Sequence, residues 1–143
     1  MDIFEEKLEH AKPFYLGILG KTEAIDNAKL TTHILRPLVE QWGRYPEKII
    51  QSSEGASSYL INLWAERHQI EIQSLHADYF KLGKRAGFLR DAMILKECTH
   101  LLVFLGTKSQ KNEEVAIRET KKGKHVFTLH PKTLEITELV LED

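Results

Sequence analysis

Apolar residues along the chain gather into short runs, which are separated by glycine, proline and charged side chains. Five of these runs have the length and composition that are typical of buried strands. They are FYLGILG at 14–20, KIIQSS at 48–53, IEIQSL at 70–75, HLLVFLG at 100–106 and HVFTLH at 125–130. The fourth is the most apolar run of the chain, and such a run is typical of a central strand in a parallel sheet.

The segments between these runs have the apolar spacing of amphipathic helices. We expect helices over 2–11, 24–42, 57–68, 84–97 and 112–122. Pro37 should kink or split the second of these helices, and Gly123 provides a C-cap after the last one. HADYF at 76–80 is expected to form an aromatic loop, and LEITELVL at 134–141 to form an edge strand or a lid.

Strands thus alternate with helices about five times. This alternation predicts an α/β fold: a single Rossmann-like domain over 1–143, with a doubly wound parallel sheet of about five strands flanked by helices. Right-handed crossovers place the loops that follow the strands at one edge of the sheet, where such folds bind ligands. The candidate loops are 20–22, 52–58, 76–90 and 106–114.

Composition narrows the function classes. The 143 residues include 20 basic and 21 acidic side chains, a balance that disfavours a protein whose main work is to coat nucleic acid. Cys98 is the only cysteine, so no intrachain disulfide can form and a reducing compartment is expected. Because no apolar run approaches the length of a membrane span, we expect a cytoplasmic protein without membrane contact. The histidines lack a ligand spacing such as HExxH, so we expect neither a metal nor a cofactor.

The first two loops could contact phosphate. Gly20 and Lys21 belong to a lone GKT, which a plain turn explains equally well. In SSEGASS at 52–58, Ser57 or Ser58 could simply be the N-cap of the next helix. The free N–H groups and hydroxyls at this helix start could also receive a phosphate. The candidate contacts in this loop are Ser53, Gly55 and Ser57.

The third loop and the helix after it, HADYFKLGKRAGFLRDAMI at 76–94, combine basic, aromatic and glycine residues. Basic groups make charge-assisted contacts with phosphate, and Tyr79 or Phe80 could stack on a base. Composition alone favours a solvated basic face with structural glycines. If the segment binds a ligand, the candidate contacts are Asp78, Tyr79, Lys84, Gly87, Arg90 and Asp91.

From residue 52 to about residue 129, the chain resembles the SLOG superfamily, and most closely its small YspA-like proteins. SLOG is the Rossmann-like group that includes the LOG phosphoribohydrolases and the DNA-processing protein DprA. The YspA-like pattern A-D-W-x-x-x-G-x-x-A-G-x-x-R-N is matched by Ala77-Asp78-Tyr79, Gly83, Ala86-Gly87 and Arg90-Asp91, and Met93 follows. Asp91 stands where asparagine is usual, and the loop after the fourth strand keeps one glycine of the family's GGxGT phosphate cradle.

The resemblance implies ligand contacts in that fourth loop, at Gly106, Thr107 and Ser109. In LOG-type enzymes, an arginine and the glutamate of PGGxGTxxE support cleavage of an N-glycosidic bond. Arg90 is a positional match for the arginine, and Glu113 or Glu114 falls near the glutamate but outside its motif. If the protein is an enzyme, we therefore expect Arg90 and Glu114 to be its catalytic residues.

Our main hypothesis is a protein that senses or sequesters a nucleotide or nucleotide-derived molecule, of the ADP-ribose-like or cyclic kind. Domains resembling SLOG are proposed ligand recognisers in bacterial and phage conflict, so a sponge for a signalling nucleotide is one form of it. The alternative is a LOG-like N-glycosidase or phosphoribohydrolase. A DprA-like nucleic-acid binder is disfavoured by the neutral charge. The resemblance also implies a homo-oligomer, with 2–11 and 134–141 as possible contact elements.

Overall fold

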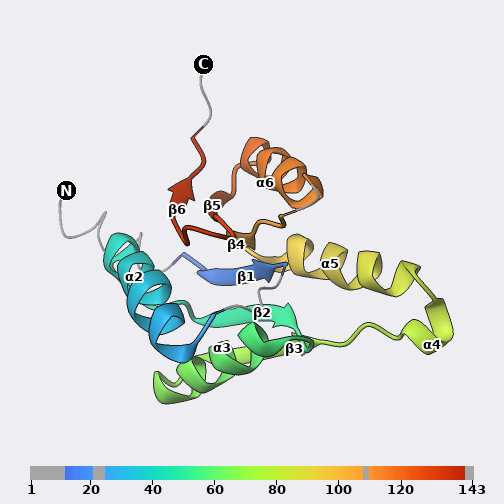
Figure 1. Ribbon diagram of the computed structural model, residues 1–143, viewed down its shortest axis with the longest axis horizontal. Helices are drawn as coiled ribbons and strands as arrows, with labels where there is room; N and C mark the ends of the chain where they lie inside the picture. The colour runs from blue at the N-terminus through green and yellow to red at the C-terminus, as the bar shows by residue number, and fades with distance from the viewer. Residues whose placement is uncertain (1–11, 21–24, 108–109, 141–143) are drawn as a thin grey trace.

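The computed structural model describes residues 12–20, 25–107 and 110–140. Within these ranges, one six-stranded sheet is flanked by helices on both faces (Figure 1). The predicted Rossmann-like α/β architecture is therefore confirmed, with one strand more than the five that were counted first. The expected helix over 2–11 lies outside the described residues.

The sheet has the strand order β3-β2-β1-β4-β5-β6. Its strands are β1 Tyr15–Leu19, β2 Lys48–Ser52, β3 Glu71–Leu75, β4 His100–Phe104, β5 His125–Leu129 and β6 Ile136–Glu138. The first five strands are mutually parallel, whereas β6 runs antiparallel to β5 at the edge. LEITELVL thus contributes an edge strand rather than a lid. The direction of winding reverses between β1 and β4, which makes the gap between their carboxyl ends the topological switch point.

Helices connect the strands much as the apolar spacing predicts. They are η1 Lys29–Leu35, α2 Arg36–Trp42, α3 Ala56–Arg67, α4 Tyr79–Leu82, α5 Arg85–Glu97 and α6 Lys111–Lys121. Pro37 does split the first long helical segment: it lies in the first turn of α2, directly after the π-helical turns of η1. Proline is tolerated there because its missing N–H group interrupts no regular α-helical hydrogen bond.

Two local predictions are wrong. The segment 76–80 is not entirely a loop, because the Asp78 side chain accepts a hydrogen bond from the backbone N–H of Lys81 at 3.0 Å and caps the single turn of α4. Neither Ser57 nor Ser58 is the N-cap of α3; this position is held by Gly55, at a φ of +96° that favours glycine. Both serines lie buried in the first turn of α3, where the Ser58 hydroxyl donates to the Glu54 carbonyl at 2.8 Å.

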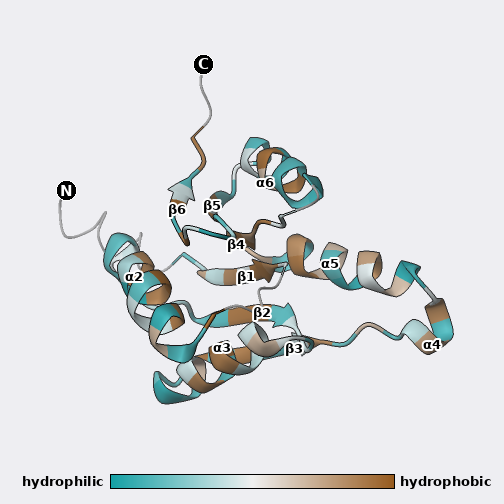
Figure 2. Ribbon diagram, in the orientation of Figure 1, coloured by the Kyte–Doolittle hydropathy of each residue, from teal (hydrophilic) through white to brown (hydrophobic). Residues whose placement is uncertain are grey.

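The core has two layers, one on each face of the sheet, and in Figure 2 the apolar colour follows the strands. One layer packs strand residues such as Leu16 and Leu102 against η1, α2 and α3, and the other packs Leu19 and Val103 against α5 and α6. Burial of each such side chain contributes about 1.5–3 kcal/mol. Among the described residues, no helix is long and apolar enough to cross a membrane.

Candidate functional site

The switch point between β1 and β4 is closed by an unusually close backbone approach at Gly20. This residue follows β1 with a φ of +81°. A Cβ atom at this position would lie 2.5 Å from the carbonyl oxygen of Phe104 and 2.8 Å from Nδ2 of Asn112. Both distances are too short for any side chain, so the ends of β1 and β4 can meet in this way only around a glycine.

Asn112 is a site residue that the sequence analysis missed. It lies in the first turn of α6, and its Nδ2 donates a hydrogen bond to the carbonyl oxygen of Phe104 at 3.3 Å. This contact ties the start of α6 to the end of β4 beside Gly20. A polar amide in the first turn after a buried strand was the available signal, but it is a weak one.

Two helices begin at this edge of the sheet without a side-chain cap. The N-cap of α3 is Gly55 and that of α6 is Gln110, and neither makes a capping hydrogen bond through a side chain. The first backbone N–H groups of a helix have no partner within the helix, and the helix dipole adds partial positive charge there. These two helix starts are therefore suited to an anion such as a phosphate.

Arg90 is held inside a cluster of polar side chains. Its Nε lies 3.1 Å from Oδ1 of Asp91, and its Nη1 lies 3.6 Å from Oε2 of Glu54 and 3.4 Å from the hydroxyl of Tyr79. Burial lowers the pKa of Arg90, but Asp91 and Tyr79 outweigh that effect and hold it above its ordinary value. The guanidinium is thus charged and already shared between two carboxylates. It links α5 to α4 and to the loop after β2.

This cluster contains three of the predicted contacts, Tyr79, Arg90 and Asp91, and adds Glu54, which the sequence did not indicate as a partner. Gly87 lies beside it, since a Cβ atom there would be 3.4 Å from the Tyr79 hydroxyl. An acidic residue in a loop before a helix has many possible partners. Only the fold brings Glu54 to a residue 36 positions later.

The remaining predicted contacts are spread along the same edge. The Ser53 hydroxyl lies 3.4 Å from Nδ1 of His76, which joins the ends of β2 and β3. Lys84, Gly106 and Thr107 are exposed, and Asp78 is occupied in capping α4. Lys21 and Ser109 lie outside the described residues.

Glu114 does not join the Arg90 cluster through any contact within the described part of the chain. It is exposed in the first turn of α6, together with Glu113. Carboxylates at this position stabilise a helix through its dipole. This role accounts for both residues without a catalytic function.

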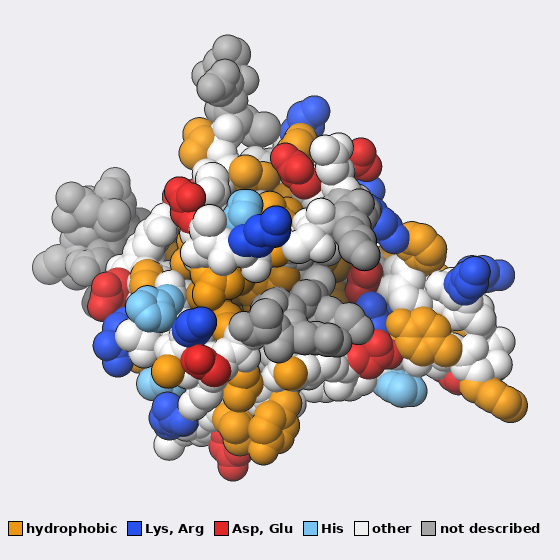
Figure 3. Space-filling view, viewed as in Figure 1, with side chains coloured by type: hydrophobic (Ala, Val, Ile, Leu, Met, Phe, Trp, Pro, Cys, Tyr) orange, Lys and Arg blue, Asp and Glu red, His pale blue; other side chains and the backbone are white. Residues whose placement is uncertain are grey.

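An apolar surface beside the Arg90 cluster was not predicted. Large hydrophobic side chains are exposed along α4 and α5, at the right-hand end of the view in Figure 3. They are Tyr79, Phe80, Leu82, Phe88, Leu89 and Met93. Beside them runs a groove of about 600 Å³, lined by Leu82, Leu89 and Met93 and reaching Asp78 and Arg90. Its volume lies within the range of small-molecule sites.

No group of three histidine, cysteine, aspartate or glutamate side chains that could hold a metal ion occurs in residues 12–20, 25–107 and 110–140. Comparisons of the chain with protein-family models, curated proteins and solved structures found no match.

Proposed function

We propose that the protein binds a nucleotide or nucleotide-derived small molecule at the carboxyl edge of its sheet, for sensing or sequestration. The observation that carries the proposal is the switch point, where Gly20 packs against Phe104 and Asn112 while α3 and α6 start nearby without side-chain caps. Ligands of doubly wound sheets bind at this place. The resemblance of 52–129 to the SLOG superfamily supports the same ligand class.

Each part of such a ligand has a suitable surface. The uncapped starts of α3 and α6 suit a phosphate because they offer backbone N–H groups. The groove along α5 suits a base or another flat ring, since Leu82, Leu89 and Met93 line it. Arg90 lies next to this groove but carries little unshared charge, so its role here is to position Tyr79 and Glu54.

Binding without turnover is the form that these contacts favour. The arginine that would stabilise a departing group is shared between Glu54 and Asp91, and Glu114 is exposed on α6 with no described contact to it. Glycoside hydrolysis needs two groups held on either side of the bond that breaks. The proposed cellular role is therefore recognition or sequestration of a nucleotide signal.

Mass spectrometry of small molecules released by heat from the purified protein tests this proposal. We expect an intact nucleotide derivative, which rebinds to the emptied protein in calorimetry. Free base together with a ribose phosphate would instead show N-glycosidic hydrolysis. If nothing is released, and AMP, cyclic AMP and ADP-ribose all bind with a Kd weaker than about 1 mM, the proposed function is wrong.

A matched pair of variants locates the binding. Asn112→Ala should weaken ligand binding about tenfold, because it loosens the contact between α6 and β4 at the switch point. Gln41→Ala is the control, since the Gln41 amide donates a hydrogen bond to Glu138 of β6 at 2.7 Å and lies in the last turn of α2, not in the loops of this edge. Equal losses in the two variants would contradict a site at the switch point.

A further inference from the structure

The groove beside α5 presents an apolar surface to solvent. Leu82, Leu89 and Met93, which line it, are between 39% and 49% exposed. Because α5 packs on β1 and β2, the groove lies toward the edge strand β3, where Leu75 forms part of its other wall. Contiguous exposed apolar side chains of this kind mark a surface that another element covers.

The side chains of this groove are spaced as on one side of a coiled-coil helix. Four lining residues follow one another along α5 at intervals of three, four and three residues: Ala86, Leu89, Met93 and Lys96. Such intervals place the side chains along one seam, into which a second helix packs side chains that recur at the same intervals. The groove therefore suits an amphipathic helix with this spacing.

The residues next to the groove carry positive charge that no carboxylate neutralises. Four exposed cations lie on α4, on α5 or between them: Lys81, Lys84, Arg85 and Lys96. Within the described part of the chain, none of the four side chains makes an ion pair or a hydrogen bond.

The acidic side chains of the same segment already have partners. Asp78 caps α4, Asp91 binds Arg90, and Glu97 lies 3.7 Å from Lys48. Two copies of α5 packed against each other would therefore bring like charges together. A helix that carries acidic side chains beside its apolar stripe is the complementary occupant.

Residues 1–11 of this chain have that complementary pattern. They lie outside the described residues, and the sequence predicts a helix over 2–11. The segment contains four acidic side chains and one lysine. Its apolar side chains recur at intervals of three, four and three, as those of the groove do: Met1, Phe4, Leu8 and Ala11.

Charge selects the direction in which the segment would lie. If it runs parallel to α5 with the two apolar stripes aligned, coiled-coil geometry places Glu5 next to Arg85 and Lys7 next to Glu97. The antiparallel direction would instead place Lys7 next to Arg85. The parallel direction is therefore favoured, and it sets Ala11 beside Lys96.

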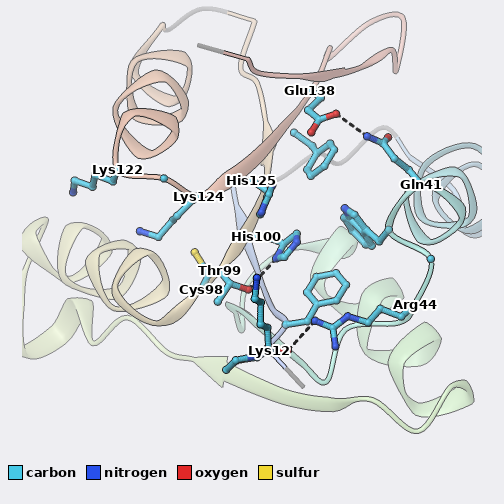
Figure 4. Close-up of a pocket in the computed structure, with 16 residues that line it drawn as sticks. Lys12, Gln41, Arg44, Cys98, Thr99, His100, Lys122, Lys124, His125 and Glu138 are labelled. Atoms are coloured by element: carbon cyan, nitrogen blue, oxygen red, sulfur yellow. Dashed lines mark hydrogen bonds between the residues drawn. The ribbon is translucent and has the colours of Figure 1, made fainter. Parts of the chain in front are cut away.

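The chain that forms the groove is not placed to supply this segment itself. Lys12 lies at a cavity of about 1010 Å³ at the amino edge of the sheet, where β1, β4 and β5 begin (Figure 4). Its carbonyl accepts a hydrogen bond at 2.8 Å from Arg44, directly after α2. Since α2 and α5 cover opposite faces of the sheet, Ala11 of the same chain does not reach Lys96 on α5.

We propose that residues 1–11 of one copy bind as a helix in the α5 groove of a second copy, and that two copies exchange these segments reciprocally. Exchange forms the contact twice, which brings the buried area closer to the roughly 800 Å² per partner of a stable interface. A base is proposed above to use the same groove, so a nucleotide would compete with the exchanged segment. This competition rests on the proposed function, whereas the exchange does not.

Sedimentation equilibrium of the full chain at about 100 μM tests the assembly. We expect a dimer, and a monomer after deletion of residues 1–11, with the backbone amide signals of 82–96 shifted by the deletion. A monomeric full chain, or a dimer that survives the deletion, would overturn the proposal. A monomer whose 82–96 signals respond to the deletion would show binding within one chain and would also contradict the exchange.

A charge swap tests the register without removing the segment. Glu5→Arg and Arg85→Glu should each weaken the dimer about tenfold, and their combination should restore it because the ion pair forms again with reversed charges. The control is Arg67→Glu, at an exposed position in the last turn of α3. Failure of the double variant to recover, or an equal loss in the control, would overturn the proposal.

These measurements use no nucleotide, so their failure leaves the proposed function intact. Addition of ADP-ribose should dissociate the dimer if a base occupies the groove. A dimer that binds ADP-ribose and persists would contradict the competition and the placement of the base.

Discussion

The two edges of the sheet differ in how they can attract an anion. At the carboxyl edge, α3 and α6 present backbone N–H groups, and the switch point is tightly closed around Gly20. At the amino edge the helices present their negative ends, so only side chains such as Lys124 and Arg44 can supply positive charge. The same parallel sheet therefore has one edge where backbone N–H groups suit an anion, and another where the charge depends on side chains.

The largest predicted effect on stability concerns Gly20 at the carboxyl edge. Gly20→Ala should lower the free energy of unfolding by about 2–4 kcal/mol, because the new methyl group would meet Phe104 and Asn112 and because the φ of Gly20 is positive. Gly43→Ala is the control: its φ is also positive, at +75°, but the space around it is open, so about 1–2 kcal/mol should be lost. Urea denaturation measures both, and equal losses would show that steric closure at the switch point is unimportant.

The stability of the amino edge of the sheet depends on one buried charge, the carboxylate of Glu119. Burial raises the pKa of the fully buried Glu119, but Lys124 and Lys122 outweigh this and hold the pKa below its ordinary value. Lys124→Met should therefore cost about 2–3 kcal/mol of unfolding free energy, since only Lys122 and Arg118 would remain beside the carboxylate. Lys121→Met, at an exposed position in the last turn of α6, should change stability by less than about 0.5 kcal/mol. Similar denaturation midpoints for the two variants would contradict the role of Lys124.

His100 should make the free energy of unfolding depend on pH. Because the pKa of His100 is about 4 in the folded chain and near 6.5 when unfolded, only the unfolded chain takes up this proton between those values. Stability therefore falls as the pH drops from about 6.5 to 4, by at most about 3 kcal/mol from this group. His100→Gln should flatten that part of the curve, measured as unfolding free energy against pH. An unchanged slope would mean that His100 is not shielded as described.

The smallest predicted effect tests how Glu54 shares the charge of Arg90. Glu54→Gln removes one of the two carboxylates that share its charge, at a cost below about 1 kcal/mol because the pair is partly exposed. Affinity for an anionic nucleotide should rise a few-fold, since one negative charge near the site is lost. Calorimetry measures this affinity, and Glu66→Gln, which removes a carboxylate elsewhere, on α3, is the control. If the affinity falls, Glu54 itself contacts the ligand.

Periodicity was enough to predict the sheet. The alternation of short apolar runs with helical segments identified five strands at nearly their observed bounds. Four of them, β1, β2, β4 and β5, are buried on both faces and therefore read as apolar runs, whereas β3 is only partly buried. The features that periodicity did not predict are determined by local hydrogen bonds and backbone angles. The cap that Asp78 provides to α4 and the glycine N-cap of α3 depend on backbone angles, and the composition of SSEGASS and HADYF does not reveal these.

The candidate sites were less predictable than the sheet. The segment at 76–94 was chosen as a candidate from its glycine, basic and aromatic residues. The partnership of Arg90 with Glu54 was not predicted, since Glu54 lies on another loop. The cavity at the amino edge was missed entirely. Its wall combines Phe14, Trp42, His100 and His125 from four separate segments, and none of them has a recognisable spacing in the sequence.

Mapping of backbone amide shifts on addition of ADP-ribose tests the central claim most directly, because one spectrum reports on both edges. We predict shifts at Gly20, Gly55 and Asn112, with His100 and His125 unchanged. Shifts confined to the amino edge, or none at ligand concentrations up to about 1 mM, would contradict a nucleotide site at the carboxyl edge.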